Sequence, residues 1–518
     1  MRCAMRRAPV AAAVMLCAVV PAAAAANPFE SEVALTPDTP IDRLVLGRLE
    51  KLGVEPAPLC SDAVFVRRAY LDVIGTLPTE QEARRFLQSK KPTKRKALIE
   101  QLLKRDEFAA YWAMKWSDIL RIKAEFPINL WPQAAEAYYR WVRTSLRDNE
   151  PYDRFVREML TATGSNFRTP PVNFYRAMQN REPRGIAQTV ALTFMGTRAD
   201  KWPAERLDGM AAFFSCLSYK PTRQWKEQVV YHDPLKEIPT TAVFPDGAKA
   251  RLTPGRDPRE AFADWLIDPK NPWFTRNVAN RVWTWLVGRG IVHQPDDIRP
   301  DNPPSNPELL AYLERELVAS KYDLKHLYRL ILNSKTYQLA SVPASKDPKA
   351  AANFASYPIR RLEAEILIDA LCRITGTNET YSSAIPEPFT FTPADQRTMD
   401  LHDGSISSSF LEMFGRPSRD TGLVSERNDR PTASQRLHLL NSSHIRTKIE
   451  RGPGLRRLLW ARGGRPVDRL YLTILSRFPT DVERKAVAAH IAASANRREA
   501  AIDLAWALVN TVEFRYRH

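Results

Sequence analysis

Apolar residues recur at helical spacing along almost the whole chain, and this periodicity constrains the fold more than any other feature of the sequence. One stripe comprises Phe108, Trp112, Trp116 and Ile119. Side chains three and four positions apart lie on one face of an α-helix, so the stripe predicts a helix with one buried face. Further stripes of the same spacing lie within 41–52, 138–146, 155–160, 262–266, 278–286, 309–317 and 324–332. The sequence therefore predicts a mainly α fold.

Helix-start signals support this prediction. In Thr39-Pro40-Ile41-Asp42, a threonine cap, a proline at the first helical position and a following acid all favour helix initiation. Gly53 is expected to end that helix. The helical stripes fall into two groups, which predict an N-terminal helical lobe over 27–227 and a C-terminal helical lobe over 257–518.

The segment 228–256 interrupts the helical pattern. Val229-Val230-Tyr231 and Thr241-Ala242-Val243-Phe244 are β-prone, and Pro245-Asp246-Gly247 is typical of a turn. We therefore expect a small β-hairpin that joins the two lobes. Residues 376–431 are rich in Pro, Ser, Thr and Gly and show little periodicity, which predicts a long irregular excursion, or lid, in the C-terminal lobe.

Two segments repeat one pattern position for position. Tyr70 to Glu82 and Tyr471 to Glu483 share a Tyr-Leu start, a Pro-Thr pair and a final glutamate. Each ends in a Thr-x-x-Glu capping box, in which both side chains satisfy amide groups at the start of a helix. The pattern indicates a recurrent helix–turn–helix unit, and an old duplication is the alternative interpretation.

The first 26 residues have the layout of a secretory signal peptide. Arg2, Arg6 and Arg7 precede an apolar run from Ala8 to Val20, and small residues follow. The run is shorter than the roughly 20 residues of a transmembrane helix, and no later stretch approaches that length. We expect export to the periplasm or cell surface, with no transmembrane segment after cleavage of 1–26.

The chain is strongly basic, with a net charge of +17. This charge favours anionic neighbours, and for an exported protein acidic glycans, lipid headgroups or an acidic protein are better candidates than nucleic acid. A solvated arginine-rich surface without a specific partner is the alternative. After signal cleavage Cys60, Cys216 and Cys372 remain, and their odd number and wide spacing give no disulfide framework.

The spacings of the common catalytic motifs are absent from the sequence. It contains no Gly-x-x-x-x-Gly-Lys phosphate loop, no strand-coupled Gly-x-Gly-x-x-Gly, no His-Glu-x-x-His and no Gly-x-Ser-x-Gly elbow. The Cys-x-x-Cys-His haem attachment motif is also missing. These absences argue against the common nucleotide-binding, zinc-protease and serine-hydrolase classes, and no cofactor is expected.

A candidate ligand-binding cluster lies on the helix predicted near 278–286. Arg276, Asn280 and Arg281 accompany Trp283 there, and arginines beside indoles can hold a sulfated or carboxylated sugar by bidentate hydrogen bonds and stacking. The favoured alternative is structural, because the segment is core-like and the arginines could pair with internal carboxylates such as Asp264.

Clustered carboxylates follow in a proline-rich segment. Asp296, Asp297 and Asp301 could bind a hard cation, although their spacing matches no defined calcium loop. The favoured interpretation is a turn before a helix that begins near Pro307.

Two histidine constellations suggest chemistry. His402-Asp403 lies beside Ser405 in the irregular segment and could form a triad, although adjacent residues rarely point at one another. His438 and His444 are six positions apart, a spacing that does not place both on one helical face. A metal site there would require a loop, so caps and surface histidines are the favoured interpretation.

Arg68 and Asp72 suggest a local ion pair. Their spacing of four residues places them as neighbours on one helix. We expect a surface or partly buried structural pair rather than a catalytic one.

Several long stretches carry a family resemblance. FVRRAYLDVIGTLPT at 65–79 resembles the opening of the planctomycete cytochrome-associated domain, and NPWFTRNVANRVW at 271–283 is similar to the start of the planctomycete surface domain. The likeness continues at 360–365, 435–442 and 507–514. The chain therefore resembles the planctomycete and verrucomicrobial exported family with paired domains of unknown function.

The chain departs from this family at two places. Many relatives carry Cys-x-x-Cys-His-Asn-His-Pro where this chain reads FMGTRADKW at 194–202, and some carry paired cysteines where it reads DTGLVSER at 420–427. Thiolate or imidazole ligation is chemically impossible with these side chains. The resemblance therefore transfers no metal, haem or redox residue to this chain.

The resemblance implies a non-catalytic exported protein that binds a partner in the cell envelope, such as the sulfatase-like exported proteins that the family often accompanies. The alternative, suggested by the basic charge, the 12 tryptophans and the excursion at 376–431, is an enzyme or binding protein acting on acidic or sulfated polysaccharides. An electron-transfer accessory role is disfavoured by the missing haem motif.

Overall fold

The computed structural model describes residues 27–239, 242–253, 255–460, 465–494 and 496–518. The predicted signal peptide, 1–26, lies outside the described residues. Helix accounts for 53% of the structure and strand for 5%, which confirms the predicted mainly α fold. Among the described residues, no helix is both long enough and apolar enough to span a membrane.

The helices of the first half match the predicted stripes. Their bounds are α1 Pro40–Leu52, α2 Asp62–Ile74, α3 Glu80–Gln88, α4 Lys94–Leu102, α5 Asp106–Ile119, α6 Pro132–Arg147, α7 Tyr152–Thr161, α8 Asn173–Arg176, α9 Pro183–Val190, α10 Ala204–Ala211, α11 Pro258–Ile267 and α12 Phe274–Val287.

The second half is also helical. Its elements are α13 Pro307–Ala319, α14 Leu324–Asn333, α15 Pro348–Ala352, α16 Ala364–Thr375, α17 Ser409–Met413, α18 Ala433–Asn441, α19 Ser443–Arg451, α20 Pro453–Trp460, α21 Pro466–Ile474, α22 Asp481–Ala493, α23 Arg497–Val509 and α24 Val512–Arg515. The strands are β1 Gly164–Ser165, β2 Leu217–Pro221, β3 Gln228–His232, β4 Arg360–Arg361 and β5 Tyr516–Arg517.

Local capping signals set several helix ends. Thr39 and Asp42 form the capping box of α1, Pro40 opens the helix, and Gly53 ends it with φ 65°. The repeated Thr-x-x-Glu pattern also forms capping boxes, at the starts of α3 and α22. The helix starts predicted from these signals are therefore confirmed.

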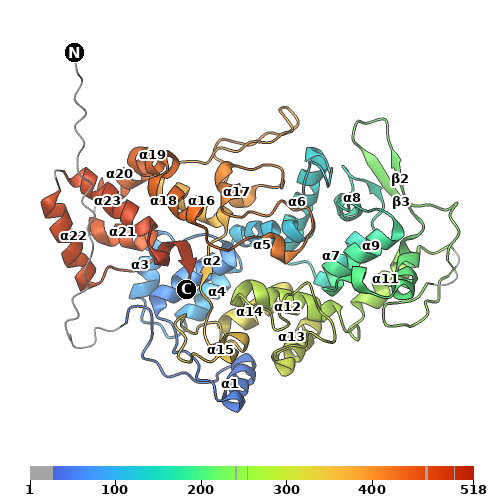
Figure 1. Ribbon diagram of the computed structural model, residues 1–518, viewed down its shortest axis with the longest axis horizontal. Coiled ribbons are helices and arrows are strands. Elements are labelled where there is room, and N and C mark those ends of the chain that lie inside the picture. Colours follow the sequence, from blue (N-terminus) through green and yellow to red (C-terminus); the bar gives the residue numbers. More distant parts are fainter. Residues whose placement is uncertain (1–26, 240–241, 254, 461–464, 495) are drawn as a thin grey trace.

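One apolar core passes through both predicted lobes. In Figure 1, α21, α22 and α23 lie at one end of the long axis and β2, β3 and α11 at the other, with α2 and α5 between them. At the centre, the ring of Trp112 on α5 lies 5.4 Å from Trp285 on α12 and 4.5 Å from Tyr328 on α14, measured between centroids. The larger buried cluster extends from Ile41 to Phe514, so the N-terminal and C-terminal helices share a core.

The small sheet differs in part from the sequence prediction. The strand predicted at 229–231 is present as β3, but it pairs antiparallel with β2 and β1 rather than with 241–244. Val243 instead bridges to Lys249 around the predicted turn at 245–247. The prediction of the partner strand was wrong because β2 is contributed by a segment that precedes 228–256, which the local hairpin signal did not include.

The 376–431 excursion is largely irregular, as predicted, with α17 as its one α-helix among the described residues. It does not extend freely into solvent. Gly404 donates its amide to Ile122 O at 3.0 Å, and Ala384 donates its amide to Glu125 Oε1 at 2.9 Å. The excursion is therefore attached to the loop between α5 and α6.

Candidate functional site

The arginines of the predicted cluster on α12 form ion pairs within the protein. Arg276 donates to Glu314 at 2.9 Å, and Arg281 donates to Asp296 at 3.1 Å. The side chains of Arg281 and Asp296 are only 1% and 5% exposed. Asn280 both donates to and accepts from the backbone of Val292. These groups fasten α12 to its neighbours. Asn280, Arg281 and Asp296 are buried and closed to a large ligand, whereas the Arg276 side chain is 40% exposed.

The other predicted residues on this side of the protein are also enclosed or paired. Trp283 is fully buried. Asp297 and Asp301 both lie 3.3 Å from Arg299. Asp296 also accepts from the amide of Val424 at 2.7 Å. Among the residues that the structure describes, no group of three or more His, Cys, Asp or Glu is placed to hold a metal ion.

The His402-Asp403-Ser405 constellation docks the excursion. Asp403 Oδ1 accepts from the amides of Ala124 and Ser405, both at 2.8 Å. The Ser405 hydroxyl accepts from the amide of Glu125 at 2.9 Å. Among the hydrogen bonds of the described residues, none joins the ring of His402 to Asp403 or Ser405. The three side chains therefore do not form a catalytic relay.

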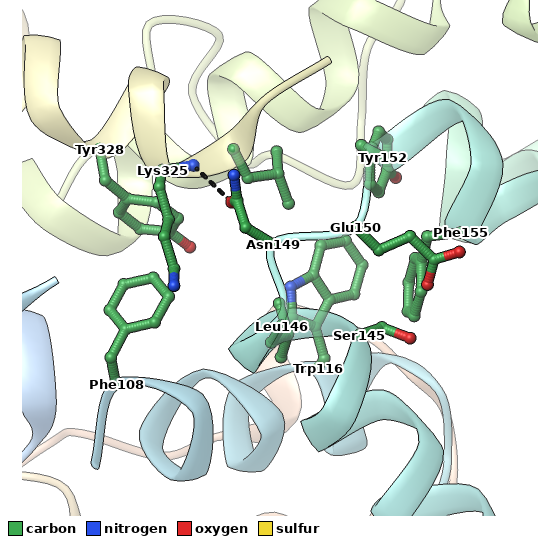
Figure 2. Close-up of a pocket in the computed structure, with 11 residues that line it drawn as sticks. Phe108, Trp116, Ser145, Leu146, Asn149, Glu150, Tyr152, Phe155, Lys325 and Tyr328 are labelled. Carbon is green, nitrogen blue, oxygen red and sulfur yellow. Dashed lines mark hydrogen bonds between the residues drawn. The ribbon is translucent and has the colours of Figure 1, made fainter. Parts of the chain in front are cut away.

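A small internal cavity lies between α5, the α6–α7 connection and α14 (Figure 2). Rings of Phe108, Trp116 and Tyr328 enclose it, and the Lys325 amide donates to Asn149 across it at 3.3 Å. Its volume of about 10 Å³ is room for one water molecule at most. It is therefore a packing defect rather than a ligand site.

A groove of about 510 Å³ separates the excursion from the start of α6. This volume is within the range of small-molecule sites. Its lining combines rings and prolines with amides, hydroxyls and two ionisable groups: Trp131, Pro132, Gln133, Glu136, Pro388, Phe389, Thr390, Phe391, Thr392, Pro393, Gln396, Leu401, His402 and Ile406. Of the predicted site residues, His402 is the one that lines this groove.

A larger groove of about 1030 Å³ lies among α20, α21, α22 and α23. Its lining is apolar apart from Arg456, Arg457, Arg497 and Arg498. Residues 461–464, which connect α20 to α21, and residue 495 lie outside the described chain. The groove beside the excursion combines aromatic rings with amides, hydroxyls and two ionisable groups, and it is therefore the candidate functional site.

Trp131 and Phe389, which line this groove, meet a third ring, Trp225, at its edge. Trp131, Trp225 and Phe389 form an aromatic cluster with ring centroids 4.6 Å, 5.4 Å and 5.7 Å apart. Trp225 is 62% exposed and Phe389 is 49% exposed. Neighbouring Phe391 is 67% exposed. Single exposed rings are common on protein surfaces, but a contiguous patch of exposed apolar surface indicates an interaction site.

The loop between α5 and α6 places Trp131 in a strained conformation. Its backbone φ is 74°, which lies in a region that residues other than glycine rarely adopt. The Trp131 amide donates to Ala124 O and the Leu130 amide to Lys123 O, both at 3.2 Å. Pro132 then begins α6. Such strain persists only where the surrounding structure enforces it, and it is typical of functional positions.

The turn between β2 and β3 presents Trp225 and a cation. Glu227 fixes this turn, because its carboxylate accepts from Ser165 at 2.5 Å and from Thr222 at 2.6 Å. The Lys226 ammonium lies 5.3 Å from the ring centroids of both Trp131 and Trp225. The aromatic cluster therefore carries a positive charge at its surface.

The excursion supplies the remaining ring and the polar lining. A turn at 386–390, in which the amides of Phe389 and Thr390 both donate to Pro386 O, holds Phe389 against the two tryptophans. At the other end of the groove, burial lowers the pKa of His402, and the nearby charges of Asp403 and Glu136 oppose this shift. His402 is therefore a neutral imidazole at pH 7, which can donate or accept a hydrogen bond.

Asp369 on α16 fixes the far side of the excursion and is expected to make stability depend on pH. It accepts from the amides of Thr398 at 2.8 Å and Met399 at 3.0 Å. Burial raises its pKa from 3.8 to about 6. Between these values the folded state binds a proton that the unfolded state does not, so this group stabilises the fold as pH falls from 6 to 4.

Urea unfolding of wild type and Asp369→Asn at pH 7, 6, 5 and 4 measures this effect. The variant cannot take up the proton, so its stability relative to wild type should decline as pH falls across this range. Asp38→Asn is the control: Thr36 and Lys335 lower the pKa of the exposed Asp38 from 3.8, so its difference from wild type should stay nearly constant from pH 7 to 5. A constant difference between Asp369→Asn and wild type would contradict the assignment.

The sequence prediction missed the aromatic cluster. Trp131, Trp225 and Phe389 lie outside the periodic helical stripes, in segments rich in proline or polar residues. A large ring in such a segment has no helical face on which to be buried. Its presence outside any helical stripe is a signal that could have identified each of these residues individually. Their meeting at one groove depends on the tertiary fold.

Two family models match the chain. Residues 40–215 match PSCyt2, described as a protein of unknown function (DUF1549), and residues 258–491 match PSD1, described as a protein of unknown function (DUF1553). No curated protein and no solved structure matches the chain. The groove is lined by residues from both matched regions, at the start of α6 and in the excursion. The chain therefore belongs to the family of proteins that combine an N-terminal PSCyt2 domain with a C-terminal PSD1 domain, both of unknown function.

Proposed function

We propose that this protein is an exported, non-catalytic binding protein for an anionic polysaccharide, which it holds in the groove between the excursion and α6. The observation that carries the proposal is the aromatic cluster of Trp131, Trp225 and Phe389 beside an open groove. Export follows from the predicted signal peptide.

The chemistry of the lining suits a sugar chain. An aromatic face is electron-rich, and it attracts the weakly positive C–H groups on the face of a pyranose ring. The amides of Gln133 and Gln396 and the hydroxyls of Thr390 and Thr392 can exchange hydrogen bonds with sugar hydroxyls. An apolar protein segment would leave these polar groups without partners.

The charges favour an acidic sugar. Lys226 lies over both tryptophan rings, where its ammonium could pair with a sulfate or carboxylate on a stacked sugar. The net charge of +17 would raise the local concentration of a polyanion around the whole protein. An acidic polysaccharide is therefore the ligand class that offers both sugar rings for the aromatic cluster and negative charges for the basic groups.

Binding without hydrolysis fits the ionisable groups. Glycoside hydrolysis normally uses two carboxyl groups placed about 5 to 9.5 Å apart across the scissile bond. Glu136 is the one carboxylate among the described residues that line the groove, and Arg140 pairs with it. The groove thus offers contacts for a sugar but lacks this catalytic pair.

Replacing Trp225 with alanine is expected to weaken binding to a sulfated polysaccharide at least tenfold, or about 1.4 kcal/mol. The side chain is 62% exposed, so the fold should be unaffected. Titration calorimetry with a sulfated polysaccharide and with its desulfated form measures the loss. Lys226→Met should weaken binding of the sulfated form and leave the weaker binding of the desulfated form unchanged.

Trp506→Ala is the matched control, because this tryptophan is 38% exposed on α23 and belongs neither to the aromatic cluster nor to the groove lining. Equal affinity of Trp225→Ala, Trp506→Ala and wild type would refute the groove as the polysaccharide site. If crosslinking in intact cells recovered an envelope protein only when Trp225 was present, a protein partner would replace the polysaccharide as occupant.

A further inference from the structure

The junction of α18 and α19 brings together two histidines that lie too far apart for one helical face. His438 lies in the last turn of α18, and His444 lies in the first turn of α19. Ser442 separates the helices in an extended conformation with φ −72° and ψ 140° and caps α19. This break turns the chain so that His438 Nε2 lies 3.3 Å from His444 Nδ1.

The separation of the two nitrogens is that of two ligands on one metal ion. Imidazole nitrogens bind zinc at about 2.0–2.1 Å in tetrahedral geometry, which places two such nitrogens about 3.3 to 3.4 Å apart. The observed 3.3 Å, at which a hydrogen bond joins the two nitrogens, matches this value, so a metal ion would replace the proton that they share. The rings are inclined at 64°, and the Phe410 ring lies against both of them, with centroids 5.8 Å and 5.9 Å away.

A carboxylate orients His444 from the other side. His444 Nε2 lies 2.9 Å from Glu379 Oε2, and Lys448 Nζ lies 3.1 Å from the same oxygen. With Glu379 accepting the Nε2–H proton of His444, the Nδ1 lone pair is directed toward His438 and accepts a hydrogen bond from its Nε2–H. Metal-binding histidines typically have such an outer partner.

We propose that His438 and His444 form an open binding site for a divalent transition-metal ion such as zinc, with Glu379 orienting His444. Imidazole ligands suit zinc, copper and nickel rather than magnesium or calcium. Among the described residues no third His, Cys, Asp or Glu completes a cluster. The two nitrogens therefore leave the other coordination positions to water or to a donor group from a ligand.

The site would join the two ends of the excursion. Glu379 lies at the start of 376–431, and both histidines follow its end. A bound ion would stabilise the folded arrangement of this region, because the unfolded chain lacks the paired nitrogens.

Zinc titration of the untagged mature protein tests the proposal. By calorimetry, wild type should bind one zinc ion per chain and His438→Ala and His444→Ala should lose this binding. Zinc should raise the Tm of wild type but of neither histidine variant. Glu379→Gln should weaken zinc binding about 10- to 100-fold while leaving one ion per chain. His490→Ala is the matched control, because His490 is 44% exposed on α22 beside Asp503.

Absence of zinc binding by wild type would overturn the proposal, as would equal zinc affinity of wild type, His438→Ala and His444→Ala. The Tm of each variant in the presence of a chelator shows whether it folds. Cobalt provides a second readout, because tetrahedral cobalt absorbs visible light. Wild type and His490→Ala should show this absorption, and its retention by His444→Ala would place the metal elsewhere.

Discussion

Replacing Arg427 with methionine is expected to lower the free energy of unfolding by about 3 to 5 kcal/mol, because the substitution leaves the buried carboxylate of Glu365 without its principal partner. Arg427 donates to both oxygens of Glu365, at 2.7 Å and 3.0 Å, and to Asp118 at 2.7 Å. The Glu365 side chain is 1% exposed. Its other cationic neighbour, Arg416, lies 3.6 Å away, too far for a hydrogen bond. Urea unfolding at pH 8 measures the loss.

This loss should depend on pH. Burial alone would raise the pKa of Glu365, but Arg427 and Arg416 outweigh it and lower the pKa to about 2. In wild type the stabilisation is therefore complete above 4.5 and is lost as pH falls toward 2. Without Arg427 burial should dominate and raise this pKa, so protonation should relieve part of the deficit. The difference between variant and wild type should be smaller at pH 5 than at pH 8.

The same substitution should disturb the groove, because Arg427 fastens the end of the excursion to α5 and α16. Limited proteolysis should cut the variant within 376–431 faster than it cuts wild type. The control is Arg446→Ala, which removes a 74% exposed arginine paired with Glu450 and should leave stability unchanged. A loss of less than about 1 kcal/mol for Arg427→Met, or equal losses at pH 5 and pH 8, would contradict the prediction.

Replacing Arg517 with methionine is expected to cost about 3 kcal/mol, the lower end of the range for breaking a buried ion pair. Arg517 is 2% exposed; it donates to Glu363 and to the Tyr111 hydroxyl, at 3.1 Å, and lies 3.3 Å from Asp72. The carboxylates keep one cation each, Lys115 at 2.5 Å from Glu363 and Arg360 at 3.4 Å from Asp72. These remaining pairs should limit the loss.

Arg517→Lys separates charge from geometry. A lysine retains the positive charge but lacks the planar group that reaches three partners, so its loss should be intermediate between wild type and Arg517→Met. Urea unfolding of all three proteins provides the comparison. If Arg517→Met were as stable as wild type, the pairs of Glu363 with Lys115 and of Asp72 with Arg360 would be sufficient, and the assigned role of Arg517 would be wrong.

Most helices could be predicted from the sequence, and most long-range pairings could not. The Thr480–Glu483 capping box is confirmed because both residues lie within one helical turn. The local pair of Arg68 with Asp72 was a wrong prediction, although the spacing permits it. Arg68 donates to the carbonyls of Tyr337, at 2.6 Å, and Leu339, while the Asp72 carboxylate accepts from the hydroxyls of Tyr337 and Tyr357.

The candidate site shows the same division. The sequence indicated His402 and the irregular excursion, and the structure places His402 in the groove that the excursion borders. The rings of Trp131 and Trp225 gave no periodic signal, since neither lies on a helical face. The arginines of α12 pair with Glu314 and Asp296 rather than with Asp264, the partner that the sequence suggested.

By itself, the sequence determined the helical fold class, the positions of most helices and the kinship of the two domains. Helical periodicity and capping act over three to four residues, so that information is contained in short stretches of chain. The tertiary structure alone decided which buried charges pair, that three distant rings form one cluster, and that His438 meets His444. Such contacts depend on how the helices pack and which loops they bring together. The free energy of a buried charge or an exposed ring is set by its burial and by its neighbours in space.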